Sequence, residues 1–170
     1  MLKDSELPYV VIDNFLDDVH FNKVSEVMLS TAFPWFYNDN IVDEKDGGYF
    51  QFTHSFYYNH LANSNYFNLL EPVLNKLEPK GLLRIKANTT TKTDQHIIHK
   101  QHVDLDFTLP NFYTSVFYIN TNNGGTVFEE GGEVNSLENR LVTFPMHKKH
   151  TGKTCTNEKR RVVINFNYIK

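Results

Sequence analysis

The 170-residue chain has very little cysteine, with a single copy at Cys155. One thiol can form neither an intramolecular disulfide nor a zinc site built from several cysteines. We therefore expect a reduced, intracellular protein whose metal ligands, if any, are His, Asp or Glu. The sequence also lacks the run of about 18 apolar residues that a membrane-spanning helix needs. Residues 1–8 carry Lys3, Asp4 and Glu6 in place of an apolar signal-peptide core, so secretion is not expected.

An excess of positive charge is absent as well. The formal net charge is −3 and the pI is near 6.2, which disfavours a protein that coats nucleic acid by charge alone. Hydrophobic residues make up 40% of the chain and charged residues 22%, as is typical of a globular domain. Eight histidines and 14% aromatic residues stand out, and they point to a histidine-based site in an aromatic-walled fold.

The length fits one domain, residues 1–170, in which the pattern of apolar residues changes near residue 80. Residues 81–170 contain short alternating runs separated by turn residues, without a sustained helical period. The strands expected there cover residues 82–88, 98–105, 112–120, 126–129, 140–144 and 160–168. This order favours a mainly β fold with N-terminal helices: a double-stranded β-helix of the jelly-roll, cupin-like type, with residues 81–170 as the core and residues 1–80 as its support.

In the N-terminal part, the apolar spacing predicts a helix that begins after Asp17. Residues 64–77 also have helical spacing, but Pro72 either kinks this helix or opens a shorter second one from Glu71. The aromatic and Thr-rich residues 49–58 are expected to be extended.

His102 and Asp104 are the most specific local feature. On an extended strand, residues i and i+2 point to the same face, so the pair presents a nitrogen and a carboxylate to one cation. By itself the signal is weak, because eight histidines and 20 acidic residues give about one such pair by chance. His150 supplies a third ligand from a loop that is expected to fold back over the barrel mouth. Two imidazoles and one carboxylate form the open facial triad of non-haem Fe(II) oxygenases.

Four other histidines are weaker candidates. His147 competes with His150 for the third position because it directly follows the strand at residues 140–144. His96 and His99 are three residues apart and would face opposite sides of a strand, which does not suit a shared ion. His54 is expected to be a satisfied polar residue of the aromatic segment, with a place in the substrate pocket as the alternative.

Arg160 and Arg161 open the last expected strand. An arginine fork suits a carboxylate, and strand alternation allows only one of the two to enter the barrel. We favour Arg161, which would put Val163 and Asn165 on the inner face with it. The alternative places Arg160 inside.

The order of these motifs resembles the Fe(II)/2-oxoglutarate-dependent dioxygenases, and most closely their prolyl-hydroxylase-like branch with its small phage and bacterial members. The matching motifs are His102-x-Asp104, Tyr118-Ile119-Asn120, Gly124-Gly125-Thr126, Arg140-Leu141-Val142-Thr143-Phe144-Pro145, His150-Thr151-Gly152 and Arg161. The opening Val11-Ile12-Asp13-Asn14-Phe15-Leu16 before a helix is also similar to that branch, so the resemblance covers nearly the whole chain. Residues 38–48, a long polar loop, match nothing in it.

The resemblance implies that His102, Asp104 and His150 bind Fe(II). It implies that Arg161, or Arg160 in the alternative, binds the distal carboxylate of 2-oxoglutarate, and that Tyr118 lies where a tyrosine can hydrogen-bond this cosubstrate. The implied reaction consumes 2-oxoglutarate and O2, releases succinate and CO2, and hydroxylates an unactivated C–H bond of a prolyl or other amino-acid residue. Ascorbate is a candidate reductant, and no catalytic residue is expected beyond the metal centre.

The implied partner is a peptide, a protein or a small amino-acid-like substrate, in the cytoplasm, with a phage-infected host cell as one setting. The acidic balance disfavours a nucleobase substrate. The sequence contains no heptad pattern, so it is compatible with a monomer and does not define the oligomeric state. The rival interpretation is a non-catalytic cupin-like protein that binds a metal or small ligand, in which the three ligands need not converge on one ion.

Overall fold

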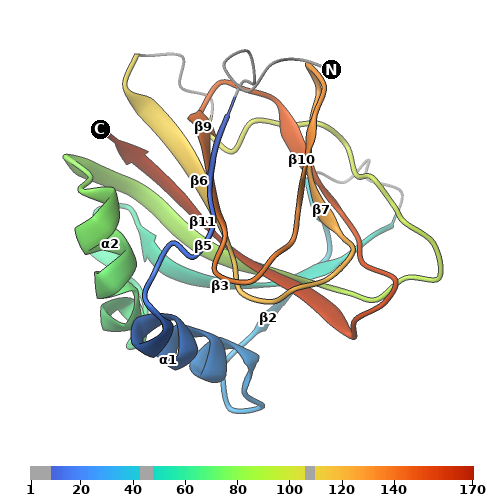
Figure 1. The fold of residues 1–170 in the computed structure, drawn as a ribbon, viewed down its shortest axis with the longest axis horizontal. Coiled ribbons are helices and arrows are strands. Elements are labelled where there is room, and N and C mark those ends of the chain that lie inside the picture. Colours follow the sequence, from blue (N-terminus) through green and yellow to red (C-terminus); the bar gives the residue numbers. More distant parts are fainter. Residues whose placement is uncertain (1–8, 43–47, 106–109) are drawn as a thin grey trace.

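A computed structural model describes residues 9–42, 48–105 and 110–170, and within them the chain forms two antiparallel sheets that face each other (Figure 1). Residues 1–8, where the sequence has no apolar signal-peptide core, lie outside the described residues, as do residues 43–47 of the expected loop. None of the described helices has the length and apolar character needed to cross a membrane.

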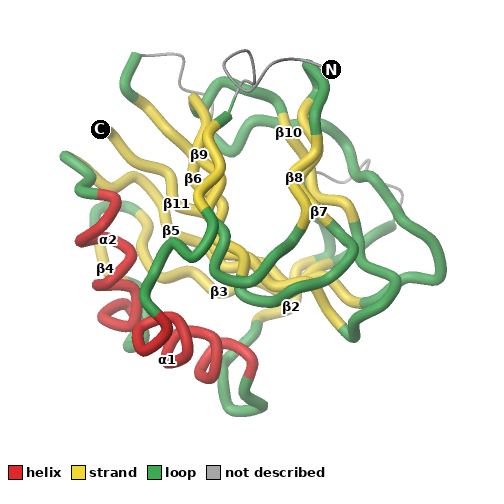
Figure 2. Tube along the Cα trace, viewed as in Figure 1, coloured by secondary structure: helices red, strands yellow, loops and turns green. Residues whose placement is uncertain are grey.

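The strands of the larger sheet come from both parts of the chain. They are β1 (Val10–Ile12), β2 (Phe36–Asn38), β3 (Gln51–Tyr58), β4 (Leu61–Ala62), β5 (Gly81–Thr91), β6 (Phe112–Tyr118), β9 (Leu141–Pro145) and β11 (Arg160–Ile169). Their order is β1-β9-β6-β11-β5-β3-β2, with β4 paired to β3. The smaller sheet consists of β7 (Gly125–Phe128), β8 (Glu133–Asn135) and β10 (His150–Lys153), in the order β10-β7-β8. These facing sheets confirm the predicted jelly roll (Figure 2).

The helices lie on the outer side of the larger sheet (Figure 1). α1 (Asp18–Leu29) begins where the sequence predicted, because the side chain of Asp17 accepts a hydrogen bond from the backbone N–H of His20 at 3.1 Å. A 3₁₀ turn (Phe67–Leu70) precedes α2 (Glu71–Leu77), which carries Pro72 in its first turn. The second of the two alternatives is therefore confirmed, and a separate helix begins at Glu71.

Strand β11 separates two apolar cores because its side chains alternate between the faces of the larger sheet. Val162, Ile164 and Phe166 belong to the core that includes Phe21, Val24 and Met28 of α1. Val163 belongs to the core between the sheets, with Val116, Val142 and Phe144 of the larger sheet and Phe128 and Val134 of the smaller one. The predicted alternation is confirmed, so Arg161, Val163, Asn165 and Asn167 face the barrel interior.

Two expectations about local structure are wrong. Residues 98–105 were predicted to be a strand, but they make only isolated bridges, at Ile98 and His102, to β10. His150 was predicted to lie in a loop, but it is the first residue of β10. The sequence of β10, His-Thr-Gly-Lys, has no apolar alternation, and its extended form depends on antiparallel pairing with β7.

Phe117 provides a test of the core under α1. Its fully buried ring packs edge-on against Phe15 and Phe21, with centroid distances of 5.9 and 6.1 Å. We expect Phe117→Ala to lower the free energy of unfolding by about 3–5 kcal/mol, because it leaves a cavity between α1 and the sheet. Urea titration would measure this against Val19→Ala, an exposed position of α1 where we expect a change below about 0.5 kcal/mol. Equal unfolding midpoints for the two variants would contradict this packing.

Candidate metal and cosubstrate site

His102 and His150 are brought together by backbone pairing. Each donates its N–H to the carbonyl oxygen of the other at 3.0 Å, so the two residues form a hydrogen-bonded antiparallel pair. Directly opposite residues of this kind carry their side chains on the same face. The ring centroids of the two histidines accordingly lie 5.0 Å apart.

Asp104 completes a group of three candidate ligands. One donor atom from each of His102, Asp104 and His150 lies within 4.8 Å of the other two. The Nε2 atom of His102 is 3.8 Å from Oδ1 of Asp104. Two nitrogen ligands and one carboxylate, without a thiolate, fit the donor preferences of Fe(II) with coordination positions left open. The structure thus brings together the three residues that the sequence analysis singled out as metal ligands.

The two imidazoles are held in the tautomer that offers Nε2 to a metal. Nδ1 of His102 lies 3.3 Å from the carbonyl oxygen of Lys100, and Nδ1 of His150 lies 3.2 Å from that of Lys148. A carbonyl oxygen can only accept, so each Nδ1 carries the proton and each Nε2 offers a lone pair. Burial lowers the pKa of His150, although Asp104 opposes the shift, and this favours the neutral ligand form.

The Asp104 carboxylate is ionised and fixed in place. Its Oδ1 pairs with Nη2 of Arg84 at 2.9 Å, and its Oδ2 accepts a hydrogen bond from Nδ2 of Asn167 at 3.0 Å. Burial alone would raise the pKa of Asp104, but Arg84, His150 and Asn167 outweigh burial and hold the pKa well below its usual value. The same Asn167 amide donates to Thr114, and its oxygen accepts from Nε of Arg84, both at 3.0 Å.

Arg161 lies in the pocket that the three candidate ligands also line. Its guanidinium donates to Ser136 Oγ at 3.0 Å and to Thr126 Oγ1 at 3.2 Å. Burial lowers the pKa of Arg161, with Tyr118 acting in the opposite direction. Among the described residues, no carboxylate lies within ion-pair distance of this guanidinium. A buried cation held by neutral hydroxyl groups is suited to receiving the carboxylate of a ligand.

Tyr118 forms one wall beside this cation. The Arg161 guanidinium carbon is 5.6 Å from the centroid of its fully buried ring, and the Tyr118 hydroxyl donates to Thr126 Oγ1 at 2.7 Å. Burial raises the pKa of Tyr118, against an opposing effect of Arg161, so the phenol stays protonated at neutral pH. Tyr118 is thus next to the predicted anchor, but its side chain is not among those that line the pocket, and its hydroxyl also lies 3.3 Å from the carbonyl oxygen of Val134.

Arg160 points the other way. Its Nη2 donates to the carbonyl oxygen of Leu29, the last residue of α1, at 2.5 Å. This orientation follows from strand alternation, since Arg161 occupies the inner face. Of the two arginines considered as anchors, Arg161 is the one that lines the pocket.

The other histidines have different surroundings. His54 is buried, with Nδ1 2.7 Å from the Pro34 carbonyl oxygen and Nε2 2.7 Å from the Ser64 hydroxyl. His96 donates from Nδ1 to the Thr154 carbonyl at 2.8 Å, and His147 is exposed. His99 lines the pocket, with its ring 5.3 Å from that of Tyr49.

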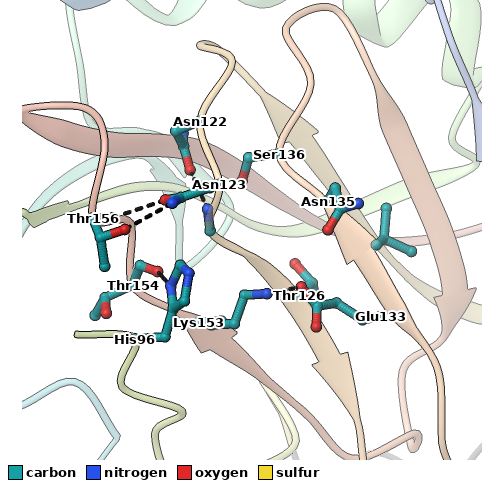
Figure 3. A network of polar contacts seen from close by, with 12 residues as sticks. His96, Asn122, Asn123, Thr126, Glu133, Asn135, Ser136, Lys153, Thr154 and Thr156 are labelled. Carbon is teal, nitrogen blue, oxygen red and sulfur yellow. Dashed lines mark hydrogen bonds and ion pairs between the residues drawn. The ribbon is translucent and has the colours of Figure 1, made fainter.

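A polar network supports the end of the pocket near Arg161. In Figure 3, Asn123 and Thr156 point toward each other, and Nδ2 of Asn123 donates to Thr156 Oγ1 at 2.7 Å. The Lys153 amine and the Glu133 carboxylate form an ion pair that links β10 to β8 (Figure 3). These contacts tie together the segments that carry Thr126 and Ser136, the two hydroxyl partners of Arg161.

Gly124 makes room for the arginine. A Cβ atom at this position would lie 3.0 Å from Cδ of Arg161 and 2.7 Å from the carbonyl oxygen of Lys153. Any larger residue would therefore push on the backbone of β10 or on the Arg161 stem. This close approach explains the glycine of the Gly124-Gly125-Thr126 motif.

Known proteins match this chain in fold but not in sequence. No family model matches the chain, and no curated protein matches it in sequence. Solved structures do match. The prolyl hydroxylase of Trichoplax adhaerens, determined with a hypoxia inducible factor peptide, superposes with a TM-score of 0.68 at 11% identity over 95% of this chain and 83% of that one.

Two further matches show the range of proteins with this architecture. The viral collagen prolyl hydroxylase of Paramecium Bursaria Chlorella virus-1 gives a TM-score of 0.61 at 12% identity, covering 98% of both chains. The α-ketoglutarate-dependent epimerase SnoN from nogalamycin biosynthesis gives 0.66 at 11% identity, over 96% of this chain and 76% of that one.

The chain has the fold of the 2-oxoglutarate–Fe(II) oxygenases. This confirms the architecture that the motif order implied. At such low identity the match supports the fold alone, and the roles of individual residues depend on the geometry of the site.

Sequence reasoning missed several residues of this site. Arg84 and Asn167 hold Asp104, and Thr126 and Ser136 hold Arg161, but none of them was singled out for such a role. Arg84 and Asn167 are directly opposite each other in the β5–β11 pairing. These two residues are 83 positions apart, so only the register of the two strands reveals that they meet, and no local motif marks them.

Asn167→Leu tests how Asp104 is held. The variant keeps the branched shape of the side chain but removes the amide that orients the carboxylate, and outer-shell changes of this kind lower metal affinity by about 10–100-fold. We expect that loss for Mn(II), measured by electron paramagnetic resonance of the free ion. The exposed Asn75→Leu on α2 is the control. Wild-type Mn(II) affinity in folded Asn167→Leu would show that the amide does not orient this ligand.

Proposed function

We propose that the protein is an Fe(II)- and 2-oxoglutarate-dependent dioxygenase that hydroxylates an unactivated C–H bond of a prolyl or other amino-acid residue. The observation that carries the proposal is that His102, Asp104 and His150 share one pocket with the buried Arg161. A metal-binding cupin without oxygenase activity needs the three ligands but has no use for a buried cation held ready for a dicarboxylate.

The three ligands would hold the iron through Nε2 of His102, Nε2 of His150 and the Asp104 carboxylate. With 2-oxoglutarate and O2, the bound iron would supply the oxidant that attacks the C–H bond, while 2-oxoglutarate is converted to succinate and CO2. Arg84 and Asn167 keep Asp104 anionic and fix the direction of its oxygens. The Lys100 and Lys148 carbonyls do the same for the two imidazoles.

Arg161 would bind the distal carboxylate of 2-oxoglutarate, with Tyr118 as a second donor. Ser136 and Thr126 restrain the guanidinium, so little conformational entropy is lost when the carboxylate binds. The bound carboxylate also gives the buried Arg161 guanidinium an opposite charge, which no described residue supplies. Arg160 has no comparable role, since its side chain is directed toward α1.

Apolar rings exclude water from one side of the metal centre. Phe144 and Phe128 pack against His150, with centroid distances of 4.7 and 6.4 Å. The Asp104 side chain is 4% exposed, whereas that of His102 is 26% exposed. Substrate would therefore approach from the His102 side of the pocket. Restricting water on the other sides protects a reactive oxidant from side reactions.

The amino-acid character of the substrate is supported by the prolyl-hydroxylase-like motif order and by two structural neighbours that are prolyl hydroxylases, one of them determined with a peptide. The same fold also serves an epimerase and a carbocyclase, so the fold alone does not define the reaction.

Anaerobic spectroscopy tests the proposal without knowledge of the substrate. Addition of Fe(II) and then 2-oxoglutarate to metal-free protein should produce the visible charge-transfer band of a chelated complex, and admission of O2 with ascorbate should then yield succinate. The band should be absent in His150→Ala, which lacks one of the three ligands. Folded wild-type protein that binds iron but gives no band would instead identify a metal-binding cupin.

The two arginines give a matched comparison. Arg161→Met should weaken 2-oxoglutarate binding by at least about tenfold, because a buried ion pair with the carboxylate is lost. Arg160→Met should leave binding within about twofold, since that side chain contacts α1. Titration of the same band with 2-oxoglutarate would give both affinities. The reverse ranking of the variants would move the anchor to Arg160.

A further inference from the structure

A row of polar side chains on β5 faces the pocket but has no part in the site described above. Lys86, Asn88 and Thr90 line the pocket, whereas Ile85 and Ala87 point into the core under the helices. This is the ordinary alternation of a strand, and it places an ammonium group inside the barrel next to the metal centre.

The register of β5 with β11 locates Lys86 along the pocket. Thr90 is opposite Arg161, and Lys86 is opposite Asn165, four residues or about 13 Å further along the strand. Arg84, which pairs with Asp104, is the next inward-facing residue. Lys86 therefore lies toward the metal end of the pocket, away from the predicted anchor of the distal carboxylate.

Lys86 has no counter-ion in the described part of the chain. The nearby carboxylate, Asp104, is already paired with Arg84 and hydrogen-bonded to Asn167. Burial lowers the pKa of Lys86, and repulsion by Arg84 adds to the effect, against a weaker attraction to Asp104. An ammonium in such a position destabilises the empty pocket unless an anion joins it.

Two neighbouring amides are also unsatisfied. The side-chain oxygens of Asn88 and Asn165 are buried and have no hydrogen-bond partner among the described residues, and both residues line the pocket. Asn165 is 8% exposed and lies directly opposite Lys86. Buried polar groups normally find partners, so this row is built to meet a polar ligand.

Binding of 2-oxoglutarate would not by itself neutralise these charges. Arg161 would take one of its carboxylates and the iron the other, while Asp104 is shared between the iron and Arg84. Among these ligands and the described residues, Lys86 would then still lack an opposite charge. The unmatched charge on Lys86 rests on the function proposed above, in which both iron and 2-oxoglutarate occupy the pocket.

We propose that Lys86 binds a carboxylate that a ligand brings to the metal end of the pocket. The charge balance favours the substrate as the source, which makes the substrate a free amino acid or a peptide with a carboxylate close to the oxidised carbon. The other source of the same chemistry is the metal-binding carboxylate of 2-oxoglutarate.

The experiment compares wild type with Lys86→Met, Lys86→Gln and the control Lys92→Met, which changes an exposed lysine just beyond β5. Its first arm measures 2-oxoglutarate affinity by anaerobic titration of the Fe(II) complex. Its second arm measures succinate release stimulated by matched acids and amides, namely the N-acetyl derivatives of proline, leucine and glutamate and their α-carboxamides. Lys86→Met replaces the half-buried ammonium with apolar volume, which is usually tolerated, and Lys86→Gln replaces it with a neutral polar group.

If Lys86 binds a substrate carboxylate, acids should stimulate succinate release at least about tenfold better than amides in wild type and in Lys92→Met. Both Lys86 variants should lose this preference while their affinity for 2-oxoglutarate stays unchanged. A cosubstrate carboxylate predicts an affinity loss of at least about tenfold in both Lys86 variants. The proposal is overturned if the variants keep wild-type affinity and either the acid preference persists or no acid is preferred. Failure of wild type to form the 2-oxoglutarate complex would instead refute the underlying function.

Discussion

The site depends on one element of backbone pairing, the reciprocal hydrogen bonds between His102 and His150. These residues are 48 positions apart, and neither belongs to the larger sheet. Pairing of β10 with β7 holds His150, and the bridge to His102 then brings the second imidazole and Asp104 to it. Because opposite residues of an antiparallel pair share a face, the ligand geometry follows from the backbone, before any side-chain contact.

The larger sheet supplies the charges around this centre. β11 pairs with both β5 and β6, and its inner face carries Arg161 at one end of the pocket and Asn167 at the other. Arg84 from β5 meets Asn167 and Asp104 at the metal end. Neutral hydroxyls hold Arg161, whereas charge holds Asp104. One end is thus prepared for an incoming anion, and the other already has its anion in place.

The parts of this arrangement that are marked by local sequence patterns could be predicted from the sequence. Alternation along residues 160–168 predicted that one of two adjacent arginines faces inward, and the structure has Arg161 there. Apolar patterning predicted the strands of the larger sheet after residue 80, since their faces are buried. It failed for β8 and β10, whose short polar sequences become extended only by pairing with β7. The sequence did not predict the roles of Arg84, Asn167 and Lys86, because these roles depend on the register between β5 and β11.

The central claim is that the metal ligands and Arg161 act on a single ligand. A crystal structure of the protein with Mn(II) and 2-oxoglutarate, prepared without O2, tests it most directly. We predict Mn(II) bound by Nε2 of His102, Nε2 of His150 and the Asp104 carboxylate, with one carboxylate of 2-oxoglutarate on the metal and the other on the Arg161 guanidinium. A metal bound by other residues, or 2-oxoglutarate that does not reach Arg161, would contradict the account.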